Sequence, residues 1–505
     1  MELFEILKSD LRGRIGILHT SHGSIDTPAF VPVVHPVKQI IPPDELKGMG
    51  FDMVITNAYI TKKRYGNEAI KKGIHNIINF DGAVMTDSGG YQVLEYGDVE
   101  VTPQEMAAFE RGILSDLAIP LDRPTGLGLG KKRASEFVRH TLRVSEQTLA
   151  DSKDNGQIWL GPIQGSEYSD LVRKSTKRLV EIGFGMLALG SPVEFMESYE
   201  YGLLSQMIIA AKRHIPHHIP LHLFGAGHPL TVGFSVALGC DTFDSASYVL
   251  YAKQGRYITE DGTRHIRDIA VFPCSCNICT SHTPKEINEM DRAEKTRCIA
   301  MHNLYSIKNE VDSVKQAIFE GRLWEYIIKK ARAHPKLFEI ISIITGNCDF
   351  FAETTPRFKS RAIFLYDSID QFRPEVLHYH AMTGRFKTRK KKLIITSESS
   401  ARPAYLSGQY RHIKKMPKIK EFQVCQYSPH LGIIPLEISD VFPAAHHETA
   451  DTDFDPHDFA TFGKTCEKFF ANNKFAEVHY DKDDRFLAYF MRKIPSGIKK
   501  RQYKK

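Results

Sequence analysis

The chain has 505 residues, of which 42% are hydrophobic and 25% charged, and its formal net charge is +7. A chain of this length normally forms at least two folding units, and the composition is that of an ordinary globular protein. No apolar run approaches the ~20 residues that cross a bilayer, and the N-terminal stretch lacks a secretory signal pattern, so we expect a cytoplasmic protein.

Short apolar runs recur through the first half of the sequence. Each ends in glycine, proline or a polar residue, and a longer stretch that could be helical follows it. The clearest runs are MVITNAY, GAVMTDSGG, LAIPLDRPTG, IWLGPIQG, GMLALGSP, IPLHLFGAG and CDTFDSAS. Their number and spacing predict parallel strands covered by helices, closed into a (βα)8 TIM barrel over residues 1–345. An open doubly wound sheet is less well supported, because neither a GxGxxG opening nor a P-loop is present.

Three of these runs end on an aspartate: Asp87, Asp122 and Asp244. The C-terminal ends of barrel strands carry the chemistry of such folds, and a carboxylate at the edge of a core is costly unless its charge is used. One such acid could simply cap a helix, but three at strand ends favour a catalytic role. A pair of carboxylates in a barrel mouth predicts displacement at the anomeric carbon of a sugar, with one acid as nucleophile and the other moving a proton.

Other strand-end residues offer groups that could hold a flat ring. Gln164, Gly190 and Phe224 end three further runs, and Tyr91 lies in the turn after Asp87. The two aromatic rings could stack on a planar base, although either could instead belong to the core.

Three cysteines lie within six residues in PCSCNICTSHTP, at Cys274, Cys276 and Cys279. Thiolates this close together indicate a metal site, and zinc suits three sulfurs and one nitrogen. The fourth ligand could be Cys298 or His302, which are one helical turn apart, or the nearby His282. A site with four protein ligands is closed to water, so we expect one structural zinc ion per chain, in an insertion of about residues 274–302.

The pattern changes after residue 345. We expect an accessory α+β domain over 346–445 and a small C-terminal domain over 446–505 that ends in a basic tail. Positive residues cluster here in KTRKKK, RHIKKMPKIK and IKKRQYKK, which indicates a nucleic-acid partner.

The motifs, taken in order, resemble those of the tRNA-guanine transglycosylases and most closely the archaeal branch of that family. The resemblance covers roughly residues 10–345 and is carried by TDSGGYQ, LDRPTG, PIQGS, ALGSPVE, HLFGAGHP, FDSASY and PCSCNIC with the later His302. It implies a zinc-containing (βα)8 barrel and a glycosyltransferase (pentosyltransferase) that acts on tRNA. Guanine at position 15 in the D-arm would be exchanged for 7-cyano-7-deazaguanine through a covalent aspartyl-ribosyl intermediate, an early step of archaeosine biosynthesis.

The resemblance also implies roles for individual residues. Asp244 would be the nucleophile, Asp87 the general acid/base, and Asp122 the acceptor for the guanine N1 and exocyclic amine. The remaining assignments are Gln164 and the Gly190 backbone at the guanine carbonyl, Tyr91 and Phe224 on the two ring faces, and Cys274, Cys276, Cys279 and His302 on zinc. Burial near other carboxylates should raise the pKa of Asp87, while hydrogen bonds keep Asp244 ionised.

Partners and rival functions follow from the same resemblance. A homodimer is the family expectation, and archaeal members usually continue into an RNA-binding PUA module where this chain has its basic tail, so a separate PUA protein could assist. One rival is the paralogous archaeosine-synthase-like enzyme that modifies the inserted base, which TDSGGY together with FDSASY argues against. Another is a non-catalytic tRNA-binding partner subunit, which would be expected to lose a catalytic acid. A bacterial-type enzyme acting at the wobble position would end soon after the zinc site.

Overall fold

The computed structural model describes residues 2–90, 101–152, 156–450, 454–481 and 485–502. The chain forms two compact units. The barrel unit comprises residues 1–319 and 325–343, and the C-terminal unit comprises residues 320–324 and 344–505. The first unit thus ends close to the boundary expected at residue 345.

The barrel unit is built on one eight-stranded sheet in which every pair of neighbours is parallel. Its strands are β4 (Ala29–Pro32), β5 (Met53–Asn57), β6 (Ala83–Asp87), β7 (Leu117–Ala118), β8 (Ile158–Ile163), β9 (Met186–Leu189), β10 (Leu221–Leu223) and β11 (Thr242–Ser245). The order is β4-β11-β10-β9-β8-β7-β6-β5, and a parallel bridge between Val33 and Ile55 joins the two outer strands. This closure confirms the predicted eight-stranded barrel.

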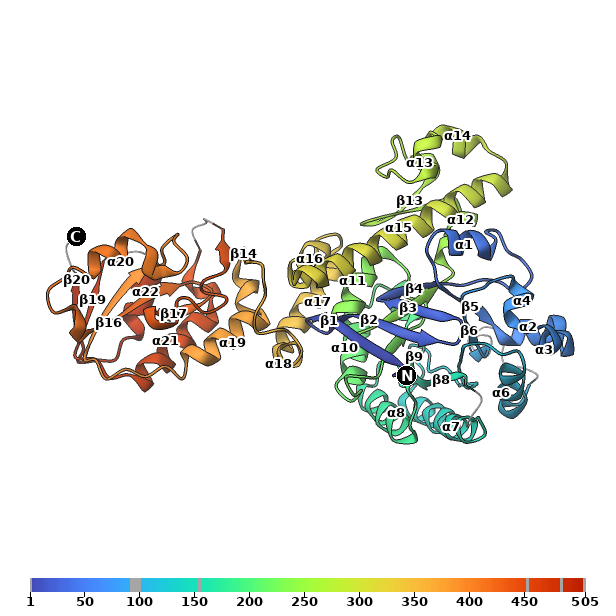
Figure 1. Ribbon diagram of the computed structural model, residues 1–505, viewed down its shortest axis with the longest axis horizontal. Helices are drawn as coiled ribbons and strands as arrows, with labels where there is room; N and C mark the ends of the chain where they lie inside the picture. Colours follow the sequence, from blue (N-terminus) through green and yellow to red (C-terminus); the bar gives the residue numbers. More distant parts are fainter. Residues whose placement is uncertain (1, 91–100, 153–155, 451–453, 482–484, 503–505) are drawn as a thin grey trace. The chain divides into compact units, whose positions relative to one another are not determined.

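Helices lie around the outside of this sheet (Figure 1). They are α1 (Pro43–Gly48), α2 (Ala58–Tyr65), α3 (Asn67–Lys72), α4 (Ile74–Ile78), α6 (Pro103–Gly112), α7 (Lys131–Ala150), α8 (Ser169–Ile182), α9 (Val193–Glu197), α10 (Tyr201–Lys212), α11 (Pro229–Ala237) and α12 (Ser247–Lys253). Capping residues in the sequence fix where some of these helices begin. In α6, for example, Thr102 and Glu105 form a reciprocal capping box and proline occupies the first turn.

An antiparallel sheet of β1 (Phe4–Asp10), β2 (Gly13–Thr20) and β3 (Gly23–Thr27) precedes the barrel. Phe4, Leu18 and Ile25 from this sheet share one buried cluster with barrel residues such as Met85 and Leu160. The sheet therefore completes the hydrophobic core inside the barrel.

The segment after β11 carries the cysteines. Its elements are β12 (Arg256–Thr259), β13 (Gly262–His265), the 3-10 turn η1 (Ile266–Asp268), α13 (Asn277–Ser281), α14 (Pro284–Glu289), α15 (Arg292–Glu320), α16 (Leu323–Ala331) and α17 (Pro335–Gly346). β12 and β13 form an antiparallel hairpin, and α15 supplies His302.

The C-terminal unit contains a five-stranded sheet in the order β17-β16-β15-β19-β20. Its strands are β15 (Lys392–Ser397), β16 (Phe422–Ser428), β17 (Gly432–Pro435), β19 (Glu477–Tyr480) and β20 (Lys499–Gln502). Only β17 runs antiparallel to its neighbour. Because β19 and β20 join the same sheet as β15, the boundary expected between residues 445 and 446 runs through one compact unit.

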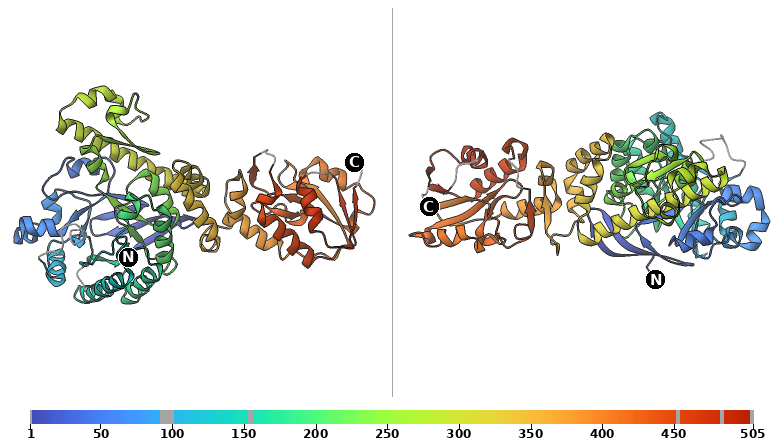
Figure 2. Two further views of the ribbon diagram at one scale, coloured as in Figure 1. Left: turned by 180° about the vertical axis from the view of Figure 1, so that it is seen from behind. Right: turned by 90° about the horizontal axis from the view of Figure 1, so that it is seen from above.

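Helices cover both faces of this sheet (Figure 1 and Figure 2). Leu393 and Ile395 pack in one cluster with α21 (Ala460–Asn472) and α22 (Arg485–Lys493), whereas Ile394 packs in another with α20 (Gly408–Ile413). This alternation is the pattern of a strand buried on both faces. The unit also contains β14 (Ile363–Leu365) paired with β18 (His447–Thr449), and the helices α18 (Cys348–Ala352) and α19 (Pro374–Thr383). Short 3-10 turns are η2 (Ser368–Phe372), η3 (Ala404–Leu406), η4 (Ile419–Glu421), η5 (Leu436–Ile438) and η6 (Pro456–Asp458).

Among the described helices, none combines the length and apolar character needed to cross a bilayer.

Candidate active site and metal centre

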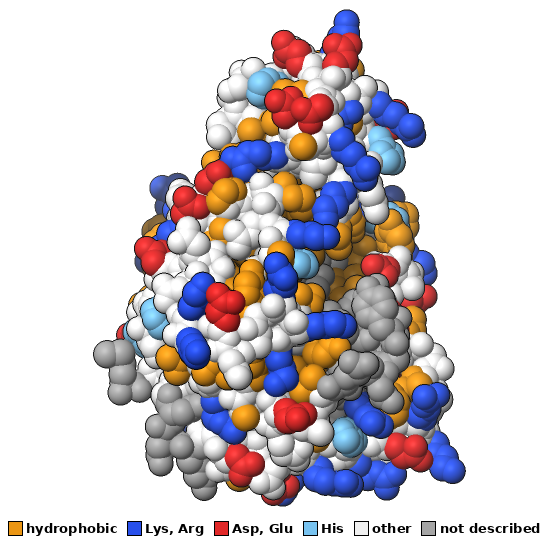
Figure 3. Space-filling model, turned by 90° about the vertical axis from the view of Figure 1, so that its right-hand side faces the viewer, with side chains coloured by type: hydrophobic (Ala, Val, Ile, Leu, Met, Phe, Trp, Pro, Cys, Tyr) orange, Lys and Arg blue, Asp and Glu red, His pale blue; other side chains and the backbone are white. Residues whose placement is uncertain are grey.

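Six of the seven residues expected to bind and react meet in one cavity of about 930 Å³ in the barrel unit. The cavity is lined by Asp87, Asp122, Gln164, Gly190, Phe224 and Asp244. These residues end or follow different parallel strands, so the barrel itself brings them to one rim. One face of the barrel unit is visibly hollowed, with hydrophobic side chains inside the hollow and Lys and Arg side chains around it (Figure 3).

Asp87 is the last residue of β6 and is held in a balance of opposing effects. Burial and the negative charges of Asp122 and Asp244 raise the pKa of Asp87 to about 7, although hydrogen bonds from the Gly89 backbone and the Asn57 side chain oppose the rise. The Asn57 amide nitrogen lies 3.3 Å from Asp87 Oδ2. A carboxyl group with this pKa can give or take a proton at neutral pH, as the sequence analysis expected.

Asp122 faces the same cavity from the loop after β7. Burial raises the pKa of Asp122 to about 6, and the hydrogen bond from Gln164 limits the rise. Gln164 Nε2 donates to Asp122 Oδ2 at 2.5 Å, while Gln164 Oε1 accepts from the backbone and hydroxyl of Thr125 at 2.9 and 2.8 Å. The Gln164 amide is therefore fixed in orientation.

Two glycines leave room for these side chains. A Cβ atom at Gly90 would overlap Asp122 Oδ1, and one at Gly190 would overlap Gln164 Nε2. The backbone N–H of Gly190, which was expected to reach the guanine carbonyl, donates to the carbonyl of Ile163 at 2.9 Å. In this structure Gly190 contributes space beside Gln164 and its N–H serves the barrel sheet.

Asp244 in β11 is positioned by two donors on one of its oxygens. His222 Nε2 lies 3.1 Å from Asp244 Oδ1, and the Gly225 N–H donates to the same atom at 3.0 Å. His222 is fully buried, and its Nδ1 lies 2.9 Å from Thr242 Oγ1. Among the described residues, none donates a hydrogen bond to Asp244 Oδ2.

His222 contacts Asp244 directly and was not among the site residues expected from the sequence. It lies in the run IPLHLFGAG, two residues before Phe224. A lone polar residue in an otherwise apolar strand is the feature of the sequence that could have pointed to it. The Phe224 ring packs edge-on against His222 with 4.7 Å between ring centroids, and its side chain is only partly buried. Tyr91, the other predicted stacking residue, lies outside the described residues.

Basic side chains border the same cavity. Lys38, Lys253 and Arg256 line it, and so does His35. Burial and the charges of Lys38 and Lys253 lower the pKa of His35. The positive charges give this part of the cavity an affinity for anions.

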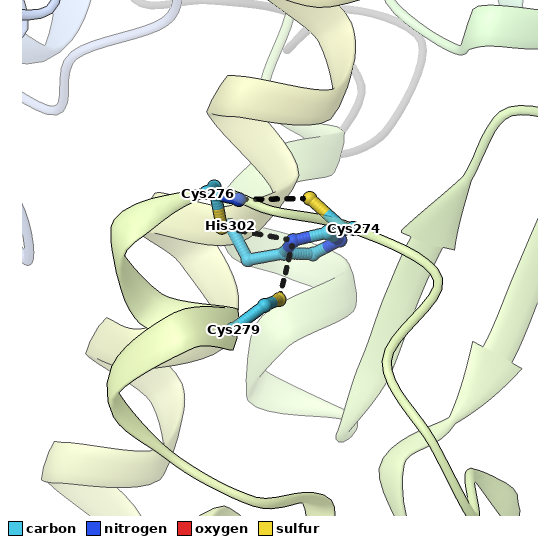
Figure 4. Close-up of side chains that lie close together, drawn as sticks. All are labelled: Cys274, Cys276, Cys279 and His302. Carbon is cyan, nitrogen blue, oxygen red and sulfur yellow. Dashed lines mark hydrogen bonds between the residues drawn. The ribbon is translucent and has the colours of Figure 1, made fainter.

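A separate group of four side chains forms the candidate metal centre (Figure 4). One ligand atom from each of Cys274, Cys276, Cys279 and His302 lies within 4.8 Å of the other three. His302 Nδ1 faces Cys276 Sγ at 3.6 Å and Cys279 Sγ at 3.4 Å. Cys298 and His282, the other candidates for the fourth ligand, do not belong to this group.

Neighbouring residues orient the histidine. His302 Nε2 lies 2.8 Å from the carbonyl oxygen of Ile258, which leaves Nδ1 as the nitrogen that faces the sulfurs. The Tyr257 ring stacks on His302 with 3.5 Å between centroids, and its hydroxyl lies 3.2 Å from Cys279 Sγ. Contacts of this kind, between a metal ligand and its neighbours, fix the tautomer and the direction of a ligating imidazole. The group could therefore hold a metal ion that joins α13 and the loop before it to α15.

Comparison with known proteins identifies related chains. Residues 10–336 match the family described as Queuine tRNA-ribosyltransferase (TGT). A tRNA-guanine(15) transglycosylase of Aeropyrum pernix is 40% identical over 88% of this chain and 86% of its own length. Proteins of the same name from Sulfolobus acidocaldarius and Methanocaldococcus jannaschii are 40% and 39% identical, over 89% and 88% of this chain and 89% and 68% of their own lengths. The chain therefore belongs to the queuine tRNA-ribosyltransferase family, a family of glycosyltransferase enzymes.

Proposed function

We propose that this enzyme exchanges guanine 15 of tRNA for 7-cyano-7-deazaguanine through a covalent intermediate on Asp244. The observation that carries the proposal is the meeting of Asp87, Asp122 and Asp244 in one cavity. The names of the relatives, which specify guanine 15, support the position of the exchange.

The first half of the reaction forms the protein–ribose bond. Asp244 Oδ2 attacks C1′ of the nucleotide, the bond from C1′ to guanine breaks, and the proton of Asp87 passes to the leaving base. The product is an ester between Asp244 and C1′, with Asp87 as a carboxylate. His222 and the Gly225 N–H support this step because they hold Oδ1 and so aim Oδ2 at the sugar.

The second half reverses the roles. The incoming base gives a proton to the Asp87 carboxylate, its ring nitrogen attacks C1′, and the ester to Asp244 breaks. The tRNA backbone stays intact, the configuration at C1′ is retained after two displacements, and both acids return to their starting state. A pKa of about 7 suits Asp87 to both transfers.

Base selection follows from the pair formed by Asp122 and Gln164. Asp122 offers acceptor oxygens to the N1–H and exocyclic amine that guanine and 7-deazaguanines share, and the second N–H of Gln164 can donate to their carbonyl oxygen. Adenine would leave these buried groups unmatched, at a cost of roughly 1–3 kcal/mol for each group.

The nucleotide must leave the tRNA stack to reach the cavity, which costs a few kcal/mol. Lys38, Lys253 and Arg256 at the cavity can offset part of this cost by attracting the flanking phosphates.

We further propose that the Cys274, Cys276, Cys279 and His302 group binds zinc. Three thiolates and one imidazole are the soft, tetrahedral donor set that zinc prefers. With four protein ligands the metal has no open position, and its contribution is to stability.

The direct test incubates the enzyme with tRNA and radiolabelled guanine. The parent should incorporate label at position 15, Asp244→Asn should incorporate none, and Asp87→Asn should be slower by roughly 10²–10⁴-fold. Asp170→Asn, which changes an exposed acid paired with Lys131, is the matched control and should behave as the parent.

A denaturing gel of the same reactions checks the intermediate. The parent should give a tRNA–protein adduct and Asp244→Asn should not. Label incorporation by Asp244→Asn at the parental rate would refute the assignment of the nucleophile.

A further inference from the structure

The C-terminal sheet has one edge at which four parallel strands begin together. β15 pairs in parallel with β16 and with β19, and β19 pairs in parallel with β20. In this register Lys392 is opposite Phe422 on one side and Glu477 on the other, and Glu477 is opposite Lys499. Residues just before these strands therefore lie along a single edge, although the sequence separates them by up to about a hundred positions.

This edge collects the basic runs that the sequence analysis singled out. The loop before β15 belongs to KTRKKK, the turn before β16 ends RHIKKMPKIK, and β20 lies in IKKRQYKK. The exposed cations here, called the basic edge below, are Lys387, Arg389, Lys391, Lys418, Lys420, Lys474, Lys499, Lys500 and Arg501.

Acidic residues neutralise only part of the basic edge. Lys392 pairs with Glu421 at 2.8 Å and with Glu477 at 3.4 Å, and Arg501 lies 3.5 Å from Glu477. Lys391, Lys420 and Lys499 form no salt bridge with any of the described residues. Several exposed positive charges thus remain available at this edge.

The arrangement fits a phosphate backbone. Neighbouring strands are about 4.8 Å apart, so the cations at the starts of the four strands form a row roughly 15 Å wide. A nucleic-acid strand carries a phosphate at every nucleotide, so a row of this width can face several successive phosphates.

A lipid surface fits less well. Proteins that bind membranes through cations usually place large apolar side chains beside them. The described exposed large hydrophobic residues include Phe358, Tyr405 and Leu406 in this unit, and none of them belongs to the segments that form the basic edge.

We propose that the basic edge of the C-terminal unit is a second binding surface for the phosphate backbone of the tRNA, in addition to the catalytic cavity. This inference rests on the proposed function, because that function supplies the RNA. The contacts would be to phosphates, so they would add affinity for tRNA without reading its sequence.

The test compares two double variants that each remove two positive charges. Lys391→Gln with Lys499→Gln changes the basic edge, and glutamine avoids placing a new carboxylate beside Glu477. Arg357→Gln with Lys464→Gln is the matched control, because both residues are exposed in the same unit but neither precedes a strand at this edge. Thermal melts check that both variants fold.

Binding of full-length enzyme to tRNA is then measured from 50 to 300 mM salt. The edge variant should bind on the order of tenfold more weakly, and its slope of log affinity against log salt should be shallower by about 2. The KM for tRNA in guanine exchange should rise by a similar factor. The control pair should bind as the parent does.

Two results would overturn the proposal: an edge variant with the affinity and salt slope of the control pair, or an edge variant that keeps its tRNA affinity but loses binding to phosphatidylserine vesicles. Failure of the proposed function would look different, because the parent enzyme itself would then incorporate no guanine while the binding comparison could still be made.

Discussion

Asp87 owes its proton-transfer capacity to a close balance at one side chain. Burial and two neighbouring acids favour its neutral form, whereas the Gly89 N–H and the Asn57 amide favour the carboxylate, and the pKa settles at about 7. A much higher or a much lower pKa of Asp87 would impair one half of the proposed reaction. The base leaves only if Asp87 is protonated, and the incoming base is activated only if Asp87 is ionised.

Replacing Asn57 by serine should shift this balance in one direction. The change removes the amide that stabilises the carboxylate, so the pKa of Asp87 should rise, by roughly one unit if the hydrogen bond contributes 1–2 kcal/mol. The alkaline limb of the pH profile of guanine exchange, expected near pH 7 in the parent, should move to higher pH.

Serine also keeps the second role of Asn57, whose Oδ1 accepts from Ile60 N at 2.8 Å to cap α2. Serine is among the best capping residues, so thermal stability should change little. An alkaline limb that stays in place or moves to lower pH would contradict this account of Asp87.

Single residues differ in how far the sequence reveals them. Asp87, Asp122 and Asp244 could be predicted because each interrupts an apolar run at its C-terminal end, and the structure brings all three to one cavity. His222 could not be recognised in the same way, because its contact with Asp244 depends on the pairing of two neighbouring strands. Local sequence does not reveal which strands pair. The sequence also suggested a ligand-binding role for the Gly190 backbone, but it could not show that the Gly190 N–H donates a hydrogen bond to the carbonyl oxygen of Ile163.

At the scale of elements, the end of the barrel opposite the cavity has its own polar anchor. Asp116, just before β7, accepts from the backbone N–H groups of His22 at 3.0 Å and Val84 at 2.9 Å. Its oxygens also lie 2.8 Å from His22 Nδ1 and 2.9 Å from His75 Nε2. One buried carboxylate thus ties the β2–β3 turn, α4 and β6 to β7.

Asp116→Asn should weaken this end of the barrel. The asparagine NH2 group would face a donor, so at least one buried hydrogen bond is lost and the unfolding free energy should fall by about 2–4 kcal/mol. Thermal melts at pH 7 would show this, and Asp170→Asn, at an exposed surface acid, should have little effect.

The effect should also depend on pH. Burial alone would raise the pKa of Asp116, but hydrogen bonds from His75, Val84 and His22 outweigh it and the pKa is lowered. A lowered carboxyl pKa adds stability above the unfolded value of about 3.9, and this stability is lost as the pH falls through the folded pKa. The difference between parent and Asp116→Asn should therefore shrink below pH 4, and a difference that stays constant would contradict the role given to the carboxylate.

The barrel elements were easier to predict than the C-terminal ones for a physical reason. Each barrel strand is followed by its own helix and pairs mainly with strands near it in the chain, so local runs reveal the fold. In the C-terminal unit β15 pairs with β19, about 85 residues later. Pairing at this distance joins segments on both sides of residue 445, where the Pro- and His-containing stretch FPAAHHETADTDFDPHD suggested a linker.

At the scale of the whole molecule, the two compact units each contain a core and one tryptophan. The chain has two tryptophans. Trp159 lies in β8 of the barrel unit and is 4% exposed, whereas Trp324 belongs to the C-terminal unit, is 1% exposed, and donates from Nε1 to Asp370 Oδ1 at 2.8 Å. The fluorescence of Trp159 therefore reports on the barrel strands, and that of Trp324 reports on its contact with Asp370 in the C-terminal unit.

Removal of the proposed zinc ion should affect the two units differently. Cys274, Cys276, Cys279 and His302 all belong to the barrel unit, and a bound ion stabilises only the folded state that presents its ligands together. In Trp324→Phe, where Trp159 reports, a strong chelator should lower the midpoint of denaturant unfolding. In Trp159→Phe, where Trp324 reports, the midpoint should stay within error of the untreated protein.

Cys276→Ser in each background is the control for the chelator. It weakens the ligand set itself, so Trp159 should report a lower midpoint without chelator and little further change when chelator is added. Metal analysis of the untreated protein should find one zinc ion per chain. A chelator that shifts the Trp324 transition as far as the Trp159 transition would show that the two units unfold as one, and a chelator that shifts neither would show that the four side chains hold no stabilising metal.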